Sequence, residues 1–280
     1  MLVGLFLSLH SPRPWTAPAV LATIDNPILN ESSGIGESTR FPGVYYTHND
    51  SGDSARFFRF KPDGTLSAVT LTGASATDWE DMEYVAIAGK HFLYFADFGD
   101  NNAKRDNVRV YRLEEPSLTA NAVNSYETYT ITYPDGPHNC EALIVNPANG
   151  DIYFATKSTT ECAIYKLPAP ATSGSFTLTR LGAVSPNTGG GNSGKLVTAG
   201  SADPTGHYVV LRTYTGALEY KVSGPFGDWW KQTPTPVTMP VDLQGEAIAY
   251  GRAGRTLVTS SEGTPFVAHI QRLLDKTGKG

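Results

Sequence analysis

The feature of this sequence that most constrains its fold is a strand–turn–strand pattern that returns five times. The copies begin at Ser32, Trp79, Cys140, Thr198 and Gly245. In each copy a first strand of small and apolar residues leads through a turn rich in Gly, Pro, Asn or Asp into a second, β-rich strand. Repeats of about 20–50 residues are typical of solenoids, propellers and arrays. We therefore expect the chain to repeat one supersecondary unit.

A third strand is predicted after every hairpin, and a fourth strand in the first four copies. The third strands are Ala55–Phe60, Val108–Leu113, Ala163–Leu167, Ala217–Val222 and Phe266–Ile270. The fourth strands are LSAVTLT, YETYTITY, SFTLTRL and TPTPVTM. The fifth copy lacks its fourth strand, while an unassigned strand, Ala19–Asp25, stands near the N-terminus. The N-terminal strand is therefore expected to complete the last unit.

This complementarity predicts a closed ring, which leaves few exposed sheet edges. The predicted fold is all-β: a single propeller of five four-stranded blades, closed by the N-terminal strand. A six-bladed ring would need a sixth hairpin, and an up-and-down sandwich would not predict complementary termini. The expected boundaries are a signal-like or disordered leader over residues 1–18, the propeller over residues 19–272, and a tail over residues 273–280.

The apolar run Leu2–Leu9 is too short to span a bilayer as a helix. It resembles the apolar part of a secretory signal, with Ala17 or Ala19 near a plausible cleavage point, although the positive segment that normally precedes it is absent. A disordered leader is the alternative. We expect a secreted protein without stable membrane insertion.

Composition narrows the possible partners. The formal net charge of −5 offers no support for nucleic-acid binding, which usually requires a basic face. We expect a monomer that binds a small molecule or a carbohydrate.

The two cysteines, Cys140 and Cys162, could pair in an exported protein or remain buried thiols, and the sequence leaves both possibilities open.

Acidic residues recur at the entry to the first strand of a copy. Glu80, Glu141 and Glu246 occupy this position in copies two, three and five, and Asp81 follows the first. In a propeller the first strands line the central channel, so these carboxylates would face one axis and repel one another unless a cation, a proton or a basic group intervened. We predict that the three glutamates are catalytic. The alternative is that each caps backbone N–H groups of a neighbouring blade.

A second acidic pattern follows the second strand of copies one and two. Asp50-Ser51-Gly52-Asp53 and Asp97-Phe98-Gly99-Asp100 share the form Asp-x-Gly-Asp, 97 − 50 = 47 residues apart. Hard oxygen ligands in a flexible loop suit Ca²⁺ better than Zn²⁺. We predict that these four aspartates and Asp81 bind Ca²⁺. The alternative is a pair of Asx-type turns in which the side chains bind loop amides.

At the position that follows the second strand, the remaining copies carry residues of mixed charge. Lys157, Arg212, Tyr214 and Glu262 are predicted to bind substrate, because an arginine forks onto anions and such a mixture suits an anionic or polyhydroxylated ligand. His48 precedes the first Asp-x-Gly-Asp loop and titrates near neutrality, so we predict that it acts as an acid or a base.

Several motifs together resemble a family of secreted bacterial β-propeller proteins described as WD40- or YVTN-like. These motifs are THNDSGD, DWEDME, DFGDNNAKRD, EALIVNPANGDIYFATK, VLRTYTGALEY and QGEAIAY…SSEG. The resemblance implies the fold and the export but no activity, and the Gly-His…Trp-Asp signature of WD40 blades is absent.

Two functions remain open. The first is an extracellular hydrolase with a Ca²⁺-supported acidic site at the central channel that cleaves a glycosidic or (phospho)ester bond. The second is a non-catalytic propeller that binds a glycan or protein and carries structural Ca²⁺. Unpaired glutamates in an open pocket would favour the hydrolase. Glutamates that all form hydrogen bonds between blades would exclude a catalytic role.

Overall fold

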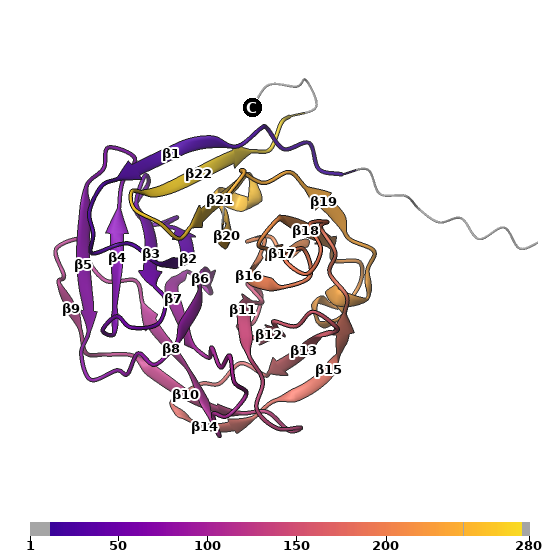
Figure 1. Ribbon diagram of the computed structural model, residues 1–280. Helices are drawn as coiled ribbons and strands as arrows, with labels where there is room; N and C mark the ends of the chain where they lie inside the picture. The colour runs from indigo at the N-terminus through magenta and orange to yellow at the C-terminus, as the bar shows by residue number, and fades with distance from the viewer. Residues whose placement is uncertain (1–11, 243, 276–280) are drawn as a thin grey trace, which may run out of the picture.

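The computed structural model describes residues 12–242 and 244–275, and within them five sheets stand around a central axis (Figure 1). Blade one contains β2 (Ser32–Glu37), β3 (Tyr45–Asn49), β4 (Arg56–Phe60) and β5 (Leu66–Leu71). Blade two contains β6 (Trp79–Ile87), β7 (Lys90–Asp97), β8 (Val108–Glu114) and β10 (Glu127–Thr132). Blade three contains β11 (Cys140–Val145), β12 (Ile152–Thr156), β13 (Cys162–Leu167) and β15 (Thr179–Val184).

The last two blades complete the ring. Blade four contains β16 (Val197–Ala202), β17 (Tyr208–Thr213), β18 (Gly216–Lys221) and β19 (Thr235–Val237). Blade five contains β20 (Gly245–Gly251), β21 (Thr256–Ser261), β22 (Phe266–Arg272) and β1 (Ala19–Ile24). Short 3₁₀ segments, η1 (Phe226–Lys231) and η2 (Arg252–Gly254), lie in blades four and five. The predicted five-bladed propeller is confirmed.

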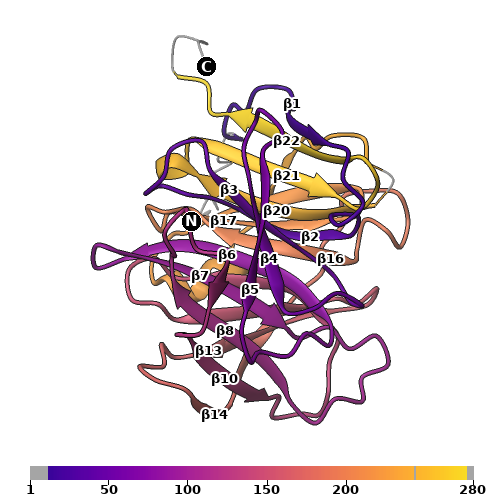
Figure 2. The same cartoon turned by 90° about the vertical axis from the view of Figure 1, so that its left-hand side faces the viewer.

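The N-terminal strand closes the ring as predicted. β1 pairs antiparallel with β22, from Ala19 opposite Ile270 to Ile24 opposite Phe266. Figures 1 and 2 both show these two strands side by side at the rim. Apolar residues of β1, such as Ala22 and Ile24, are buried in the core that blades one and five share. Closure therefore buries apolar surface in addition to pairing a sheet edge.

The described residues include part of the predicted leader. Arg13 stacks its guanidinium 4.7 Å from the Trp15 ring and 4.3 Å from the Tyr208 ring, and it lies 3.3 Å from the Glu219 carboxylate. The segment from residue 12 to residue 18 therefore packs on blades four and five. The apolar run that resembles a signal lies outside the described residues. No helix that the structure describes is long and apolar enough to cross a membrane.

One predicted strand divides into two. The segment SFTLTRL is the predicted fourth strand of blade three. Its first part belongs to β14 (Gly174–Thr177), which pairs in parallel with β10 of blade two. Its last part belongs to β15, which is the fourth strand of blade three. The short β9 (Ala122–Val123) extends blade one in the same way. These added strands cover the outer edges of two blades, whose backbone groups would otherwise be unpaired.

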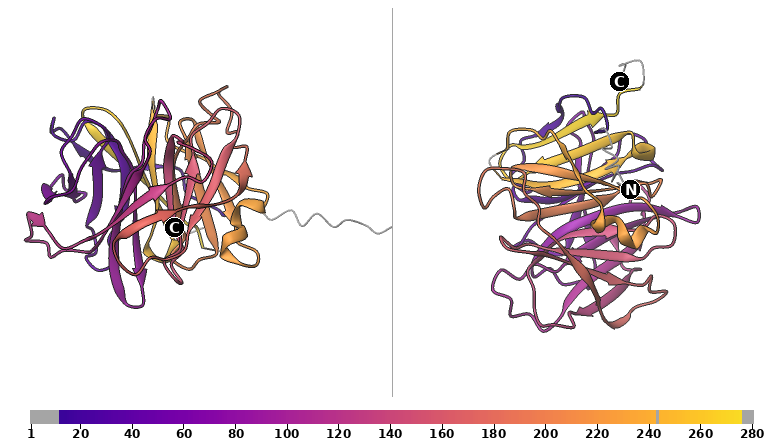
Figure 3. Two further views of the ribbon diagram at one scale, coloured as in Figure 1. Left: turned by 90° about the horizontal axis from the view of Figure 1, so that it is seen from below. Right: turned by 90° about the vertical axis from the view of Figure 1, so that its right-hand side faces the viewer.

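The strands of every blade run between the two faces of the ring, as the edge-on views in Figure 3 show. The inner strands β2, β11, β16 and β20 are buried along their whole length, and β6 over its first seven residues. Cys140 and Cys162 begin two strands of blade three, and both are buried free thiols. The alternative of two unpaired thiols therefore holds.

Candidate functional site

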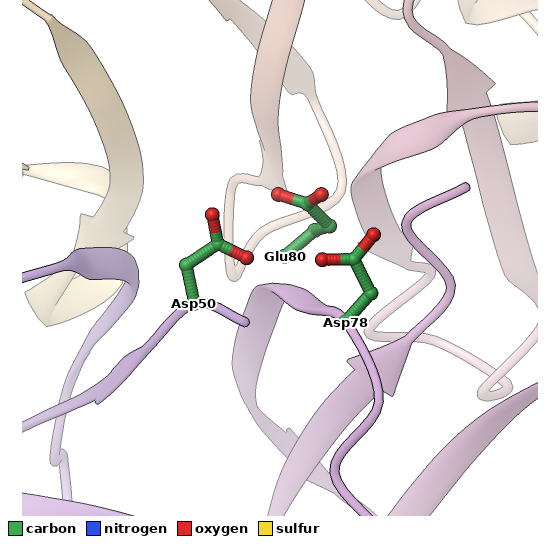
Figure 4. A group of neighbouring side chains, drawn as sticks. All are labelled: Asp50, Asp78 and Glu80. Atoms are coloured by element: carbon green, nitrogen blue, oxygen red, sulfur yellow. The ribbon is translucent and has the colours of Figure 1, made fainter. Parts of the chain in front are cut away.

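Three carboxyl groups meet at the end of the ring where the inner strands begin, which we call the channel mouth (Figure 4). Asp50 follows β3 of blade one, Asp78 precedes β6 of blade two, and Glu80 is its second residue. One oxygen from each lies within 4.8 Å of the other two. Asp50 and Asp78 are half-buried, whereas Glu80 is buried. We call these residues the carboxyl triad.

A glycine allows this approach. A Cβ atom on Gly99 would lie 2.3 Å from Glu80 Oε1 and 2.5 Å from Asp78 Oδ2, so any larger residue would displace both carboxylates. The Gly99 amide also donates to the Asp78 carbonyl at 3.1 Å. The Asp-x-Gly-Asp loop of blade two therefore supports the triad through its glycine and through Asp97, whose Oδ1 accepts the Asp78 amide at 3.0 Å.

The recurring glutamates also share a local backbone feature. In every blade the pairing of the inner strand with its neighbour shifts by one residue, and the residue at the shift is Ser33, Glu80, Glu141, Thr198 or Glu246. Such β-bulges redirect a side chain and are frequent next to active sites. Ser33 and Thr198 use their hydroxyls to bind backbone carbonyls of the next blade, at 2.6 and 3.0 Å. The three remaining bulges carry carboxyl groups.

Lys157 pairs directly with one of these carboxyl groups. Its Nζ lies 2.5 Å from Glu141 Oε2 and 2.5 Å from the Tyr214 hydroxyl. Asn139 Nδ2 donates to the other oxygen of Glu141 at 3.1 Å. Burial by itself would lower the pKa of Lys157, but the adjacent Glu141 carboxylate raises it above its ordinary value. Lys157 is therefore held as a cation.

A single ammonium does not neutralise the surrounding acids. Lys157 lowers the pKa values of Glu80, Glu141, Glu246 and Glu262, yet burial leaves all four above their ordinary values. The pKa of Glu246 rises to about 8, through burial and the charges of Glu141 and Glu262. In the triad, burial and the neighbouring carboxylates raise the pKa of Asp50 to about 7. At neutral pH this mouth therefore retains protons or attracts a cation.

Asp81 has a different environment from its neighbour Glu80. Its Oδ1 accepts the Met82 amide at 2.8 Å, and its Oδ2 accepts the amides of Leu143 and Gly200 at 2.8 and 3.1 Å. Asp81 is fully buried and joins the inner strands of blades two, three and four. Burial raises its pKa, against three backbone N–H groups that favour the charged form. This geometry does not fit the predicted role as a metal ligand.

The other aspartates of the Asp-x-Gly-Asp loops also have local partners. Asp53 binds Asn49 Nδ2 at 2.8 Å and Arg56 Nε at 2.9 Å. Asp97 lies 2.8 Å from Arg105, and Asp100 accepts the amides of residues 104 and 105 at 2.6 and 2.7 Å. These contacts match the alternative in which the side chains close loops. We therefore place Asp50 alone of the four in the candidate metal site.

His48 and Arg212 lie inside the protein rather than at the mouth. The His48 ring is fully buried and makes edge contacts with Trp79 and Phe95, and burial lowers its pKa to about 4. Arg212 is 1% exposed; it donates to the Ala247 carbonyl at 2.7 Å and lies 2.5 Å from Asp242. Neither side chain is free to reach a substrate, because packing and pairing occupy both.

Asp78 was missing from the site residues predicted from the sequence. It lies two positions before Glu80 in the motif DWED, and side chains two apart in an extended strand project to the same face. That spacing is the signal that could have identified it.

Comparisons with known proteins extend this description only to the fold. No protein-family model matches the sequence, and no curated protein matches it. Among solved structures, an α-L-arabinofuranosidase from Lactobacillus brevis is similar with a TM-score of 0.53 and 14% identity over 91% of this chain and 95% of the other. A gluconolactonase from Xanthomonas campestris has a TM-score of 0.49 and 11% identity, over 85% and 71% of the two chains. An auxiliary nutrient binding protein from Bacteroides thetaiotaomicron has a TM-score of 0.48 and 9% identity, over 92% and 76%. The propeller implied by the sequence motifs is confirmed by the five sheets of the structure, while no family match supports the particular family.

Proposed function

We propose that this protein is a hydrolase whose active site is the mouth of the propeller channel, with a cation held by the carboxyl triad. The observation that carries the proposal is the spacing of Asp50, Asp78 and Glu80, whose oxygens lie within 4.8 Å of one another. Oxygen ligands stand about 2.3–2.6 Å from Ca²⁺, so two ligands on opposite sides are about 5 Å apart. The triad therefore fits the coordination sphere of one Ca²⁺.

The charge of the triad supports the same conclusion. Burial is the largest cause that raises the pKa of each of the three groups. Repulsion within the triad adds to it for Asp50 and Glu80, whereas for Asp78 the charges of Asp97 and Asp100 add to it, and Arg105 and a hydrogen bond with Asp50 oppose it. A divalent cation would remove this repulsion and bind the oxygens in place of protons. When bound, Ca²⁺ would polarise an oxygen of the substrate.

The adjacent glutamates have different environments, as acid–base catalysis requires. Glu246 holds its proton at neutral pH, since its pKa is about 8, and it is therefore suited to be the general acid. Glu141 contacts the Lys157 ammonium directly and is the glutamate whose anion is best stabilised. We assign it the role of base or nucleophile. Tyr214 binds Lys157 and holds it in place.

The electrostatics of the mouth favour a neutral substrate. Carboxyl groups outnumber Lys157 and Arg105, the two cations that lower their pKa values, and Arg212, the predicted phosphate ligand, is paired with Asp242. An anionic phosphoester would be repelled, whereas a glycoside or a neutral ester would not. The similar fold of an α-L-arabinofuranosidase agrees with a glycosidic bond but does not identify one. We propose glycoside hydrolysis, and export to a compartment that supplies Ca²⁺.

The test is hydrolysis of a panel of neutral aryl glycosides, aryl esters and aryl phosphates, each with Ca²⁺ and with EDTA. We expect activity on a glycoside that EDTA reduces and that Glu246→Gln and Glu141→Gln each lower at least about 100-fold. The matched control is Glu114→Gln, because Glu114 is exposed and, among the residues that the structure describes, its carboxylate pairs with Lys90. Ca²⁺ binding without activity on any substrate would indicate the non-catalytic propeller instead.

A further inference from the structure

A groove of about 350 Å³ lies between blades two and three and borders the central site. It is formed by the loop after β7, the loop before β11, the ends of β12 and β13, and one residue of β15. Its polar lining includes Asn101, Asp135, His138, Asn139, Lys157 and Arg180. Its volume lies at the lower end of the range for small-molecule sites, which is about 300–1,000 Å³.

Two residues line the groove and also contact the central carboxyls. Asn139 donates to Glu141 Oε1 at 3.1 Å, and Lys157 Nζ lies 2.5 Å from Glu141 Oε2. A ligand whose reacting bond lies at Glu141 would therefore extend into the groove along these two side chains.

The opposite wall is a connected set of fixed polar groups. The Tyr165 hydroxyl donates to Asp135 at 2.9 Å and lies 2.8 Å from His138 Nε2. His138 Nε2 is also 3.1 Å from Asp135 Oδ1, and Arg180 Nε is 3.5 Å from Asp135 Oδ2. Tyr165 is buried, whereas Asp135, His138 and Arg180 each keep about a third or more of the side chain exposed. The wall thus presents both donors and acceptors in fixed positions.

The charges along the groove are paired, unlike those of the channel mouth. Arg180 contacts Asp135 and also Glu161, at 2.5 Å, and Lys157 is paired with Glu141. Asp100 accepts two backbone amides. A strongly charged ligand would gain little from such a surface. A neutral ligand with many hydroxyls could bind it, because each hydroxyl both donates and accepts.

We propose that this groove is a subsite for a neutral sugar unit next to the bond that is cleaved, so that the substrate is an uncharged oligosaccharide. The proposal rests on the proposed hydrolase function for the position of the cleaved bond. It goes beyond that function by defining the substrate class and a binding surface outside the channel.

The test measures binding in a Glu246→Gln background, so that sugars are not cleaved. The probes are neutral xylo-, arabino- and cello-tetraose, with tetragalacturonate as the charged comparison, titrated by calorimetry. We expect one neutral tetrasaccharide to bind and Arg180→Ala to weaken it at least about tenfold. Asn101→Trp, an exposed substitution at the lip of the groove, should weaken it similarly by filling the space. Arg255→Ala, an exposed arginine in blade five, is the matched control and should change nothing.

Thermal unfolding of each variant controls for folding, because Arg180 lies on the surface and its replacement should leave the melting temperature near that of the parent. The inference is overturned if no neutral tetrasaccharide binds at millimolar concentration, if only the charged one binds, or if both groove variants bind as well as the control. Failure of the proposed hydrolase function would give a different result from failure of the subsite. Sugar binding that depends on Arg180, with no hydrolysis by the wild type, would retain the subsite and reject the catalytic role.

Discussion

Asp50→Asn tests the carboxyl triad most directly, because it removes one repelling charge and keeps the shape of the side chain. Burial, with the charges of Asp78, Glu141 and Glu262, raises the pKa of Asp50 from 3.8 to about 7. The folded protein therefore binds this proton more tightly than the unfolded chain does. Between pH 3.8 and 7 the unfolded chain loses the proton while the folded protein keeps it, so stability falls as pH rises, and above pH 7 the loss is complete.

The size of this loss follows from the shift. A change from 3.8 to about 7 corresponds to about 4 kcal/mol at 1.36 kcal/mol for each pKa unit. Asp50 is only half-buried, and solvent screens part of the interaction, so we expect about 2 kcal/mol. In EDTA at pH 8 the variant should therefore be more stable than the wild type by about 2 kcal/mol. At pH 4.5 the difference should shrink to about 0.5 kcal/mol, because that pH lies near the start of the interval from 3.8 to about 7 over which the stability is lost.

Urea unfolding at both pH values, with EDTA and with Ca²⁺, measures these free energies. Ca²⁺ at about 100 times its Kd should stabilise the wild type by about 2–3 kcal/mol and the variant by much less. Asp63→Asn is the control, because the exposed Asp63 binds Thr65 and its pKa is lowered rather than raised. A variant no more stable than the wild type in EDTA at pH 8 would refute the idea that the triad carries repelling charge.

Three further substitutions test the neighbouring groups. Lys157→Met leaves the Glu141 carboxylate buried beside one amide donor. We expect this variant to lose about 3 kcal/mol of unfolding free energy, measured with urea. Glu141→Gln in the same chain should restore most of that loss. Asp81→Asn places a side-chain N–H group against backbone N–H donors and should lower the free energy of unfolding by about 2 kcal/mol. The affinity for Ca²⁺, measured by calorimetry, should stay unchanged. A large loss of affinity would instead support a role of Asp81 in metal binding. Gly99→Ala should weaken Ca²⁺ binding by at least about tenfold, because its Cβ would occupy the space of two triad oxygens, and an unchanged Kd would contradict the site geometry.

The candidate site was only partly predictable. Glu80, Glu141 and Glu246 could be grouped because equivalent positions of a propeller repeat converge on the axis, and Lys157 could be placed at the same level for the same reason. His48 was misplaced, because the strand pattern does not show that its ring turns between two aromatic side chains of blade two. The free state of the two cysteines could not be predicted either, because it depends on where the side chains point.

Local patterns in the sequence predict the ring: five hairpins, their inner strands and the N-terminal strand that completes blade five. These features depend on alternation, turn chemistry and spacing, which are local properties of the chain. Which carboxyl groups meet at the channel mouth depends on contacts between blades. Asp81 and Glu80 are adjacent in the chain, yet Asp81 binds amides of two other blades while a bulge directs Glu80 toward Asp50 and Asp78. The difference arises because hydrogen-bond partners 62 and 119 residues away become available only when the ring has closed.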